Sequence, residues 1–278
     1  MRSLPNTYQF KNDWLTEHAA EVKTLVLGNS HAYYGLRTSM LDSAFSLANG
    51  SQATECDEFL LRKFAPQCPH LRTVVFVVDN SGLFDIPLED SDEWFRCTYY
   101  RLYMGYTKHS WLSRYNFELA HYASMMEKFR LHLGGGIVDC DSAGWGTRFR
   151  LEAKDMKQWS RDTVAATYTV DRHRCRNWLS AVANREVVLR VADYCQQHRL
   201  RLVLLKTPVW STYTSRVSTV QQFFLEDLRK KCRREYGAVL LDYSSDPRFL
   251  SDDFFDTDHL SDVGATKFTH ILHEEQGI

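Results

Sequence analysis

Four short polar segments of this 278-residue chain hold residue types that could carry out nucleophilic chemistry. Three of them directly follow apolar runs, and these are Gly28-Asn29-Ser30-His31, Asn49-Gly50-Ser51 and Asp79-Asn80-Ser81. The fourth, near the C-terminus, places Asp256 and His259 three residues apart. A serine becomes an effective nucleophile when a neutral histidine removes its proton and a carboxylate orients that histidine. Ser30, His259 and Asp256 are therefore the candidate nucleophile, general base and orienting acid.

Each of these residues also has a structural interpretation when it is taken alone. A serine that follows a strand often caps a helix, and a histidine ahead of a helix often serves as a hydrogen-bond partner. Asp256 and Asp258 could simply stabilise the positive end of the helix that follows them. The combination favours the triad, because the i to i+3 spacing lets a short turn bring Asp256 beneath the imidazole of His259. In such a turn Asp258 is expected to point elsewhere.

Acyl transfer also needs fixed donors for the negative charge that develops on the carbonyl oxygen. The candidates are the backbone amides of Ser30 and Gly50 and the side chain of Asn80, with Ser81 as the alternative to Asn80. Gly50 suits this role because the absence of a Cβ lets a substrate approach the backbone. Its alternative interpretation is a simple turn glycine.

The elements that must position these residues alternate along the chain. Apolar runs predict strands over 22–27, 44–48, 73–78, 200–205 and 239–241. Helical spacing predicts helices from Ser51, as a possible N-cap, to Phe64, over 217–228, and from Ser261 onward. This alternation predicts an α/β fold with a parallel sheet and right-handed crossovers. Ligands bind such sheets at the carboxyl ends of the strands, where the candidate residues lie.

Composition bounds the class of protein. The 34 basic and 35 acidic residues give a net charge of −1, which argues against a nucleic-acid partner. No apolar run approaches the ~20 residues of a membrane span, so no integral membrane segment is expected. Seven cysteines without a CxxC pair or a metal-ligand rhythm predict reduced thiols and no metal. The one metal alternative groups His31, Asp79, Asp256 and His259 around a divalent ion.

Two segments together resemble the SGNH (GDSL-like) hydrolase and acyltransferase superfamily, especially its bacterial branch related to envelope polysaccharide O-acetyltransferases. They are LVLGNSHAYYGL (Leu25 to Leu36) and DFFDTDHLSDVGATKF (Asp253 to Phe268), with a weaker similarity in SLANGSQ (Ser46 to Gln52). The resemblance covers both ends of the fold but not the middle. It implies a three-layer α/β/α, flavodoxin-like domain in which Ser30 follows the first strand and Asp256-x-x-His259 precedes the last helix.

The sequence departs from the family's pattern at two places. Asn29 stands where the family commonly has Asp, and the customary GxND block is absent, with Val78-Asp79-Asn80-Ser81 in its expected place. The resemblance implies a serine esterase or O-acetyltransferase that needs no cofactor and acts on an acyl ester or acetylated carbohydrate. The missing GxND block motivates the alternative of a degenerate, non-catalytic glycan-binding domain.

We expect a single domain over residues 1–278, with a helical insertion at about 85–180, where aromatic, Arg and His residues are frequent. The chain as written predicts a cytoplasmic protein. Leu4 to Lys11 also resembles the segment that follows a membrane anchor in envelope relatives, and with such an anchor the domain would work outside the cytoplasm. The sequence leaves the two locations open.

Overall fold

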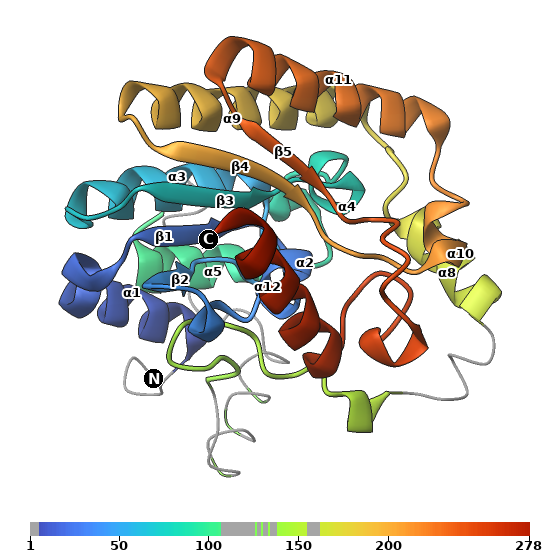
Figure 1. The fold of residues 1–278 in the computed structure, drawn as a ribbon, viewed down its shortest axis with the longest axis horizontal. Coiled ribbons are helices and arrows are strands. Elements are labelled where there is room, and N and C mark those ends of the chain that lie inside the picture. Colours follow the sequence, from blue (N-terminus) through green and yellow to red (C-terminus); the bar gives the residue numbers. More distant parts are fainter. Residues whose placement is uncertain (1–5, 107–125, 127–128, 130–132, 134–137, 155–161) are drawn as a thin grey trace.

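A five-stranded, all-parallel sheet forms the centre of the molecule (Figure 1). The computed structural model describes residues 6–106, 126, 129, 133, 138–154 and 162–278. The sheet has the order β2-β1-β3-β4-β5, and its strands are β1 (Thr24–Leu27), β2 (Ala44–Ser46), β3 (Thr73–Val77), β4 (Arg201–Lys206) and β5 (Val239–Asp242). This strand order is the one found in flavodoxin-like sheets, in which the order of strand addition reverses between β1 and β3 although all strands run in the same direction. The predicted α/β class with a parallel sheet is confirmed.

The central strands are buried on both faces, as expected for a parallel sheet covered by helices. Leu25 and Leu27 belong to one hydrophobic core, whereas Val26 belongs to the other. This alternation follows from the two-residue period of a strand. All five predicted strands are present, but β2 ends at Ser46 and β3 at Val77, so each is shorter than predicted.

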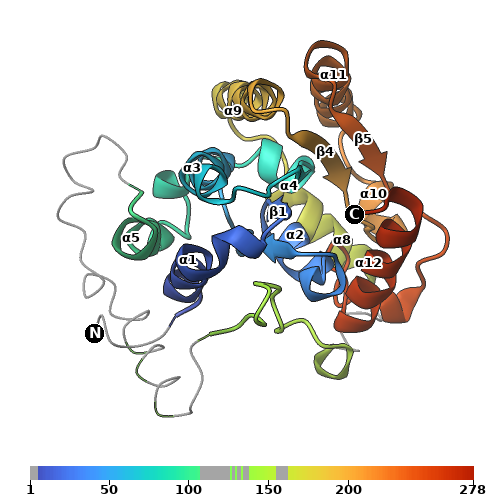
Figure 2. The same ribbon diagram turned by 60° about the vertical axis from the view of Figure 1, so that its left-hand side comes forward.

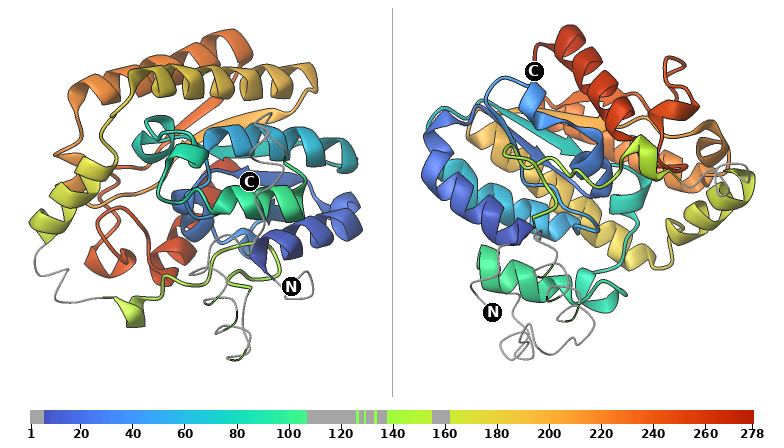
Figure 3. Two further views of the ribbon diagram at one scale, coloured as in Figure 1. Left: turned by 180° about the vertical axis from the view of Figure 1, so that it is seen from behind. Right: turned by 90° about the horizontal axis from the view of Figure 1, so that it is seen from below.

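Helices cover both faces of the sheet. The helices of the described residues are α1 (Thr7–His18), α2 (Ser30–Gly35), α3 (Thr54–Phe64), α4 (Asn80–Leu83), α5 (Arg96–Tyr99), α8 (Asp162–Arg172), α9 (Trp178–Gln197), α10 (Ser211–Thr214), α11 (Thr219–Tyr236) and α12 (Asp262–Gln276). Buried residues of α1, α3, α9 and α11 share one core, and those of α2 and α12 share the other. Figures 2 and 3 show α3 and α9 on one side of the sheet and α2 and α12 on the other. Within this part of the chain, no helix combines the length and the apolar composition needed to cross a membrane.

Of two serines predicted to cap helices, one does so in the structure and the other does not. Ser261 caps α12 as its position suggests, because its hydroxyl accepts a hydrogen bond from the Gly264 N–H at 3.2 Å. Ser51 was expected to cap the helix after β2, and that prediction is wrong. Ser51 has a left-handed φ of 53°, and the chain makes one more turn before α3 begins at Thr54, with Ala53 as its N-cap.

The predicted insertion at about 85–180 includes residues 107–125, 127–128, 130–132, 134–137 and 155–161, which lie outside the described residues. Its described part contains α5, a π-helical turn over Tyr100–Met104, and α8. Residues 138–154 form a loop with little helix, and this loop packs on α2. Gly146 N–H donates to the Tyr33 carbonyl and Trp145 Nε1–H to the Tyr34 carbonyl, each at 2.8 Å.

Candidate active site

Ser30 is the first residue of α2, and a sharp turn after β1 places it at the carboxyl edge of the sheet. Gly28 makes this turn with a φ of 132°, and a Cβ there would lie 3.0 Å from Cβ of Ala32 and 3.1 Å from Cβ of Val77. Only glycine fits both the conformation and the space. Asn29 then caps α2, since its Oδ1 accepts from the His31 N–H at 2.9 Å. Ser30, the nucleophile candidate, therefore begins a helix whose position after β1 is determined by Gly28 and by the Asn29 cap.

The structure brings the three predicted catalytic residues into one chain of hydrogen bonds. Ser30 Oγ and His259 Nε2 are 2.8 Å apart, although 229 positions separate them. On the other side of the ring, His259 Nδ1 lies 3.0 Å from both carboxylate oxygens of Asp256. This is the arrangement in which an imidazole can take a proton from a serine while a carboxylate stabilises the resulting cation.

A local turn orients Asp256, as the i to i+3 spacing predicts. Its Oδ1 accepts the backbone N–H groups of Asp258 at 3.1 Å and of His259 at 2.8 Å. Phe255 N–H donates to the His259 carbonyl at 2.9 Å and closes the turn. The carboxylate is thus held by its own segment, just ahead of α12.

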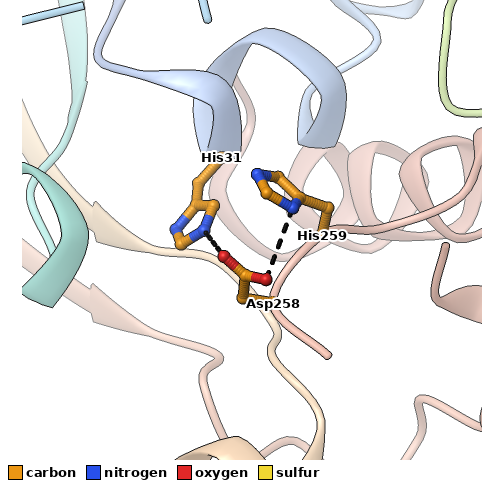
Figure 4. Close-up of side chains that lie close together, drawn as sticks. All are labelled: His31, Asp258 and His259. Carbon is orange, nitrogen blue, oxygen red and sulfur yellow. Dashed lines mark hydrogen bonds and ion pairs between the residues drawn. The ribbon is translucent and has the colours of Figure 1, made fainter. Parts of the chain in front are cut away.

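Asp258 does not point elsewhere, so that prediction is wrong. Its Oδ1 lies 3.5 Å from His259 Nδ1, and its Oδ2 lies 3.1 Å from His31 Nε2 (Figure 4). Burial by itself would lower the pKa of His259, but the carboxylates of Asp256 and Asp258 raise it well above its ordinary value. The same cluster holds the pKa of Asp258 well below its usual range, because His259 and His31 outweigh the effect of burial. The histidine therefore faces two carboxylates rather than one.

His31 forms a second, buried network beside the triad. Its side chain is almost fully buried, and its Nδ1 contacts the carboxylate of Asp79 while its Nε2 contacts Asp258. Burial opposes a charge on His31, yet the facing carboxylates raise its pKa to about 9. Asp79 also accepts from the Ser81 hydroxyl at 2.7 Å, and Ser81 accepts from the Asn29 amide at 2.6 Å. Residues after β1 and β3 are thereby joined across the point where the strand order reverses.

His173, which follows α8, reaches the same cluster from the predicted insertion. Its Nε2 lies 3.9 Å from Asp258 Oδ2, and its Nδ1 lies 2.9 Å from the Tyr213 hydroxyl. Burial lowers the pKa of His173 to about 4 despite the neighbouring carboxylate. His173 is therefore a neutral partner at physiological pH, in contrast to His31.

A cavity of about 540 Å³ opens in front of Ser30. Asn29, Ser30 and Ser81 line it at the carboxyl edge of the sheet, together with Ser51 from the loop after β2. Charged side chains of both signs line much of the rest, and these are Asp85, Asp90, Asp92, Glu93, Arg172, Arg174 and Arg176. Apolar and aromatic side chains line it as well, and these are Ala53, Phe84, Ile86, Leu88 and Tyr168. The space in front of the nucleophile candidate therefore has polar and apolar walls and is wide enough for a small ligand.

The candidate oxyanion donors differ in their availability. In the described residues no acceptor is recorded for the backbone N–H of Ser30 or of Gly50. Gly50 precedes Ser51, which lines the cavity, whereas Asn80 is not among the lining residues and its buried Oδ1 has no hydrogen-bond partner. Ser81 lines the cavity, but both its hydroxyl and its N–H donate to Asp79. The backbone amide of Ser30 is thus the donor that geometry favours, whereas the amide of Gly50 stays a prediction, because Gly50, like Asn80, is not among the lining residues.

Three potential metal ligands, in His31, Asp258 and His259, lie with their atoms within 4.8 Å of one another. The metal alternative had grouped His31 and His259 with Asp79 and Asp256 instead. Asp79 contacts His31 at the ring nitrogen that faces away from Asp258, whereas Asp256 faces the same nitrogen of His259, Nδ1, that Asp258 faces. Since each of these atoms has a hydrogen-bond partner, charge pairing accounts for the cluster without an ion.

A buried carboxyl group that the sequence did not single out joins two of the site loops. Asp57 of α3 accepts from the Gly28 N–H at 2.8 Å and from the side-chain amide of Gln52. Burial raises the pKa of Asp57 to about 8, even though both hydrogen bonds favour its charged form. His173 and Asp57 were missed, and His31 was named only as a possible metal ligand, because their roles depend on partners far away in the sequence. The position of Asp79 directly after β3 was the one available signal for the partner of His31.

No protein-family model matches this chain, and no curated protein matches it either.

Proposed function

We propose that this protein is a serine-dependent acyl-ester hydrolase or O-acyltransferase with a three-layer α/β/α domain of the SGNH type. The observation that carries the proposal is the continuous contact from Ser30 Oγ through His259 to Asp256, with distances of 2.8 and 3.0 Å. The resemblance of the two end segments to SGNH enzymes supports it, because Ser30 and Asp256-x-x-His259 occupy the positions that the family uses.

The reaction follows from these contacts. Ser30 Oγ attacks the ester carbonyl while neutral His259 takes the hydroxyl proton at Nε2, and Asp256 holds the protonated ring at Nδ1. The tetrahedral intermediate then expels the alcohol, which receives the proton from His259. The acyl group remains on Ser30 until water or a sugar hydroxyl, deprotonated by His259, attacks it. Hydrolysis and transfer differ only in this last acceptor.

The amides of Ser30 and Gly50 would stabilise the oxyanion. They lie at the start of α2 and in the loop after β2, and neither has another acceptor among the described residues. Removing one oxyanion donor typically costs ~10²–10³ in rate, so the absence of a side-chain donor from Asn80 or Ser81 would make the enzyme slow rather than inactive.

The charged side chains of the cavity favour a hydroxyl-rich substrate. Its lining combines arginines such as Arg172 and Arg176 with carboxylates such as Asp85 and Asp92, and these groups can hydrogen-bond to sugar hydroxyls. We therefore propose an O-acetylated carbohydrate as donor or product, in agreement with the polysaccharide O-acetyltransferases that the sequence resembles.

A fluorophosphonate probe, which reacts with activated serines, tests the proposal. We expect labelling of the folded wild-type protein and none in Ser30→Ala, while Ser215→Ala, which lies outside the cavity, keeps full labelling. His259→Ala and Asp256→Asn should retain the fold, checked by circular dichroism, and lose turnover of an aryl acetate by ~10³-fold or more. Labelling that persists in Ser30→Ala would rule out this nucleophile.

The second candidate is a non-catalytic binding domain, and the engaged donors of Ser81 favour it. It predicts that folded wild-type protein is not labelled and still binds an acetylated glycan. The probe experiment and a binding isotherm together separate the two functions.

A further inference from the structure

His31 is a buried histidine next to the nucleophile candidate, and the triad does not use it. Its side chain is 2% exposed, and each of its two ring nitrogens faces a carboxylate from a different segment. Asp79 comes from the end of β3, and Asp258 comes from the turn before α12. A carboxylate only accepts hydrogen bonds, so both contacts are hydrogen bonds only if both ring nitrogens carry a hydrogen. The geometry thus describes an imidazolium held between two anions.

Asp258 links this imidazolium to the general base. In Figure 4 its two oxygens point to different rings, Oδ2 to His31 at 3.1 Å and Oδ1 to His259 Nδ1 at 3.5 Å. The rings of His31 and His259 have their centroids 4.8 Å apart. His259 also has Asp256 at Nδ1, so without compensation two negative charges would favour its protonated form. A protonated His259 cannot accept the proton of Ser30.

We propose that His31 is a positioning residue that compensates part of the charge of Asp258, so that His259 is held less strongly in its protonated form than two uncompensated carboxylates would hold it, and the imidazole can act as a base. The inference rests on the proposed function, because it assigns His259 the role of base. His31 acts through Asp258 and touches neither substrate nor Ser30 in this scheme.

The groups around the cluster support this assignment. His31 faces Asp79, Asp258, His259 and, at a centroid distance of 6.2 Å, His173. His259 faces Ser30, Asp256 and Asp258, and the rings of Tyr34 and Phe149 add no charge. Asp258 faces His31, His259 and His173, of which His173 is neutral because burial lowers its pKa to about 4. Among the described residues that contact Asp258 and do not belong to the triad, His31 therefore supplies the compensating charge.

The test follows the protonation of His259 against pH by NMR of protein whose histidine rings are isotope-labelled. All variants are made in the full-length Ser30→Ala background, so the measurement does not depend on turnover. Removing the cation in His31→Gln should raise the pKa of His259, and removing the anion in Asp258→Asn should lower it, each by about one unit or more. The double variant, which loses one charge of each sign, should titrate close to the Ser30→Ala parent. A purely structural role predicts no such pair of opposite shifts.

His173→Gln is the matched control, because His173 also contacts Asp258 but carries no charge at neutral pH. It should leave the pKa of His259 within a few tenths of a unit of the parent. If His31→Gln does not fold, NMR of the His31 ring nitrogens in the Ser30→Ala parent tests the proposal instead. The proposal requires that both nitrogens carry a hydrogen at pH 7. A neutral His31, or shifts of the same sign in the two single variants, would overturn the proposal.

The outcome is independent of whether the protein cleaves esters. Opposite shifts in a protein that shows no labelling and no turnover would uphold the charge pairing and reject the proposed function. Ester cleavage together with an unchanged pKa of His259 in the variants would uphold the function and reject the role of His31.

Discussion

The protonation of one residue, His259, decides whether the site can work. Its Nε2 lies against Ser30, and its Nδ1 faces Asp256 at 3.0 Å and Asp258 at 3.5 Å. Burial favours the neutral ring, whereas the two carboxylates raise the pKa of His259 well above its ordinary value of 6.5. The neutral form is the one that accepts a proton from the serine, so the raised pKa has a direct kinetic consequence.

We expect kcat/KM for an uncharged aryl acetate to rise with pH through an apparent pKa above 6.5. The sign follows because a raised pKa keeps His259 protonated, and therefore inactive as a base, over a wider range of acidic pH. A pH profile corrected for spontaneous hydrolysis measures this limb, and Ser30→Ala provides the baseline. An acid limb at or below pH 6.5 would contradict the assignment of His259 as a base that faces two carboxylates.

At the scale of elements, loop 138–154 fixes the helix that carries Ser30. The Gly146 N–H donates to the Tyr33 carbonyl and the Trp145 indole N–H to the Tyr34 carbonyl in α2, and Phe149 stacks on Tyr34 with ring centroids 3.9 Å apart. Gly144 lets the loop approach β2 closely, because it has a φ of 82° and a Cβ there would lie 2.4 Å from the Ser46 carbonyl oxygen. The loop therefore depends on glycine for both conformation and space.

Gly144→Ala should destabilise the protein more than Gly237→Ala by about 1–3 kcal/mol in urea unfolding. Both glycines have a positive φ, but nothing lies within 4 Å of a Cβ at Gly237, which ends α11. The comparison isolates the steric contact with Ser46 from the cost of a left-handed conformation, which both variants share. Equal losses of stability would show that loop 138–154 does not pack on β2 in this way.

At the scale of the whole molecule, the parallel sheet brings the ionisable groups of the candidate site together at one edge. Parallel strands bring their carboxyl ends together, and the reversal between β1 and β3 leaves room there for the polar network. Three buried groups of this region have raised pKa values, namely Asp57 at about 8, His31 at about 9, and His259 well above 6.5. Each binds its proton more tightly in the folded state than in the unfolded state.

The free energy of unfolding should therefore fall as pH rises from 6.5 to 8. The stability from His31 is fully present below its unfolded pKa of 6.5 and is lost as pH approaches its folded pKa of about 9. Asp57 acts in the same direction between its unfolded pKa of 3.8 and its folded pKa of about 8, because only the unfolded state ionises freely there. Urea unfolding at several pH values measures this slope.

Asp57→Asn separates the contribution of Asp57 from that of the histidines. Asparagine keeps an oxygen that can accept from Gly28 and Gln52, but it cannot ionise. Its stability relative to wild type should increase by more than about 1 kcal/mol from pH 5 to pH 8, since one pKa unit corresponds to about 1.4 kcal/mol. A constant difference across this range would mean that Asp57 does not resist ionisation in the folded protein.

Local patterns in the sequence were sufficient to predict where the strands lie and which residues form the candidate triad. A β-branched run such as Thr73–Val77 favours a strand buried on both faces, and the turn that joins Asp256 to His259 is closed within four residues. The strand–helix alternation then placed Ser30 at the same edge of the sheet. These features depend on neighbours in the chain, which a sequence shows directly.

Tertiary structure alone decided the partners of the remaining polar groups. The direction of Asp258, the pairing of His31 with Asp79, the arrival of His173 and the contact of Asp57 with Gly28 all join distant segments. Such contacts depend on strand register and side-chain direction, and burial then sets the protonation state of each group. A sequence contains the residues of this network, but the folded sheet sets the protonation state of each of them, because it decides which groups are buried and which charges face them.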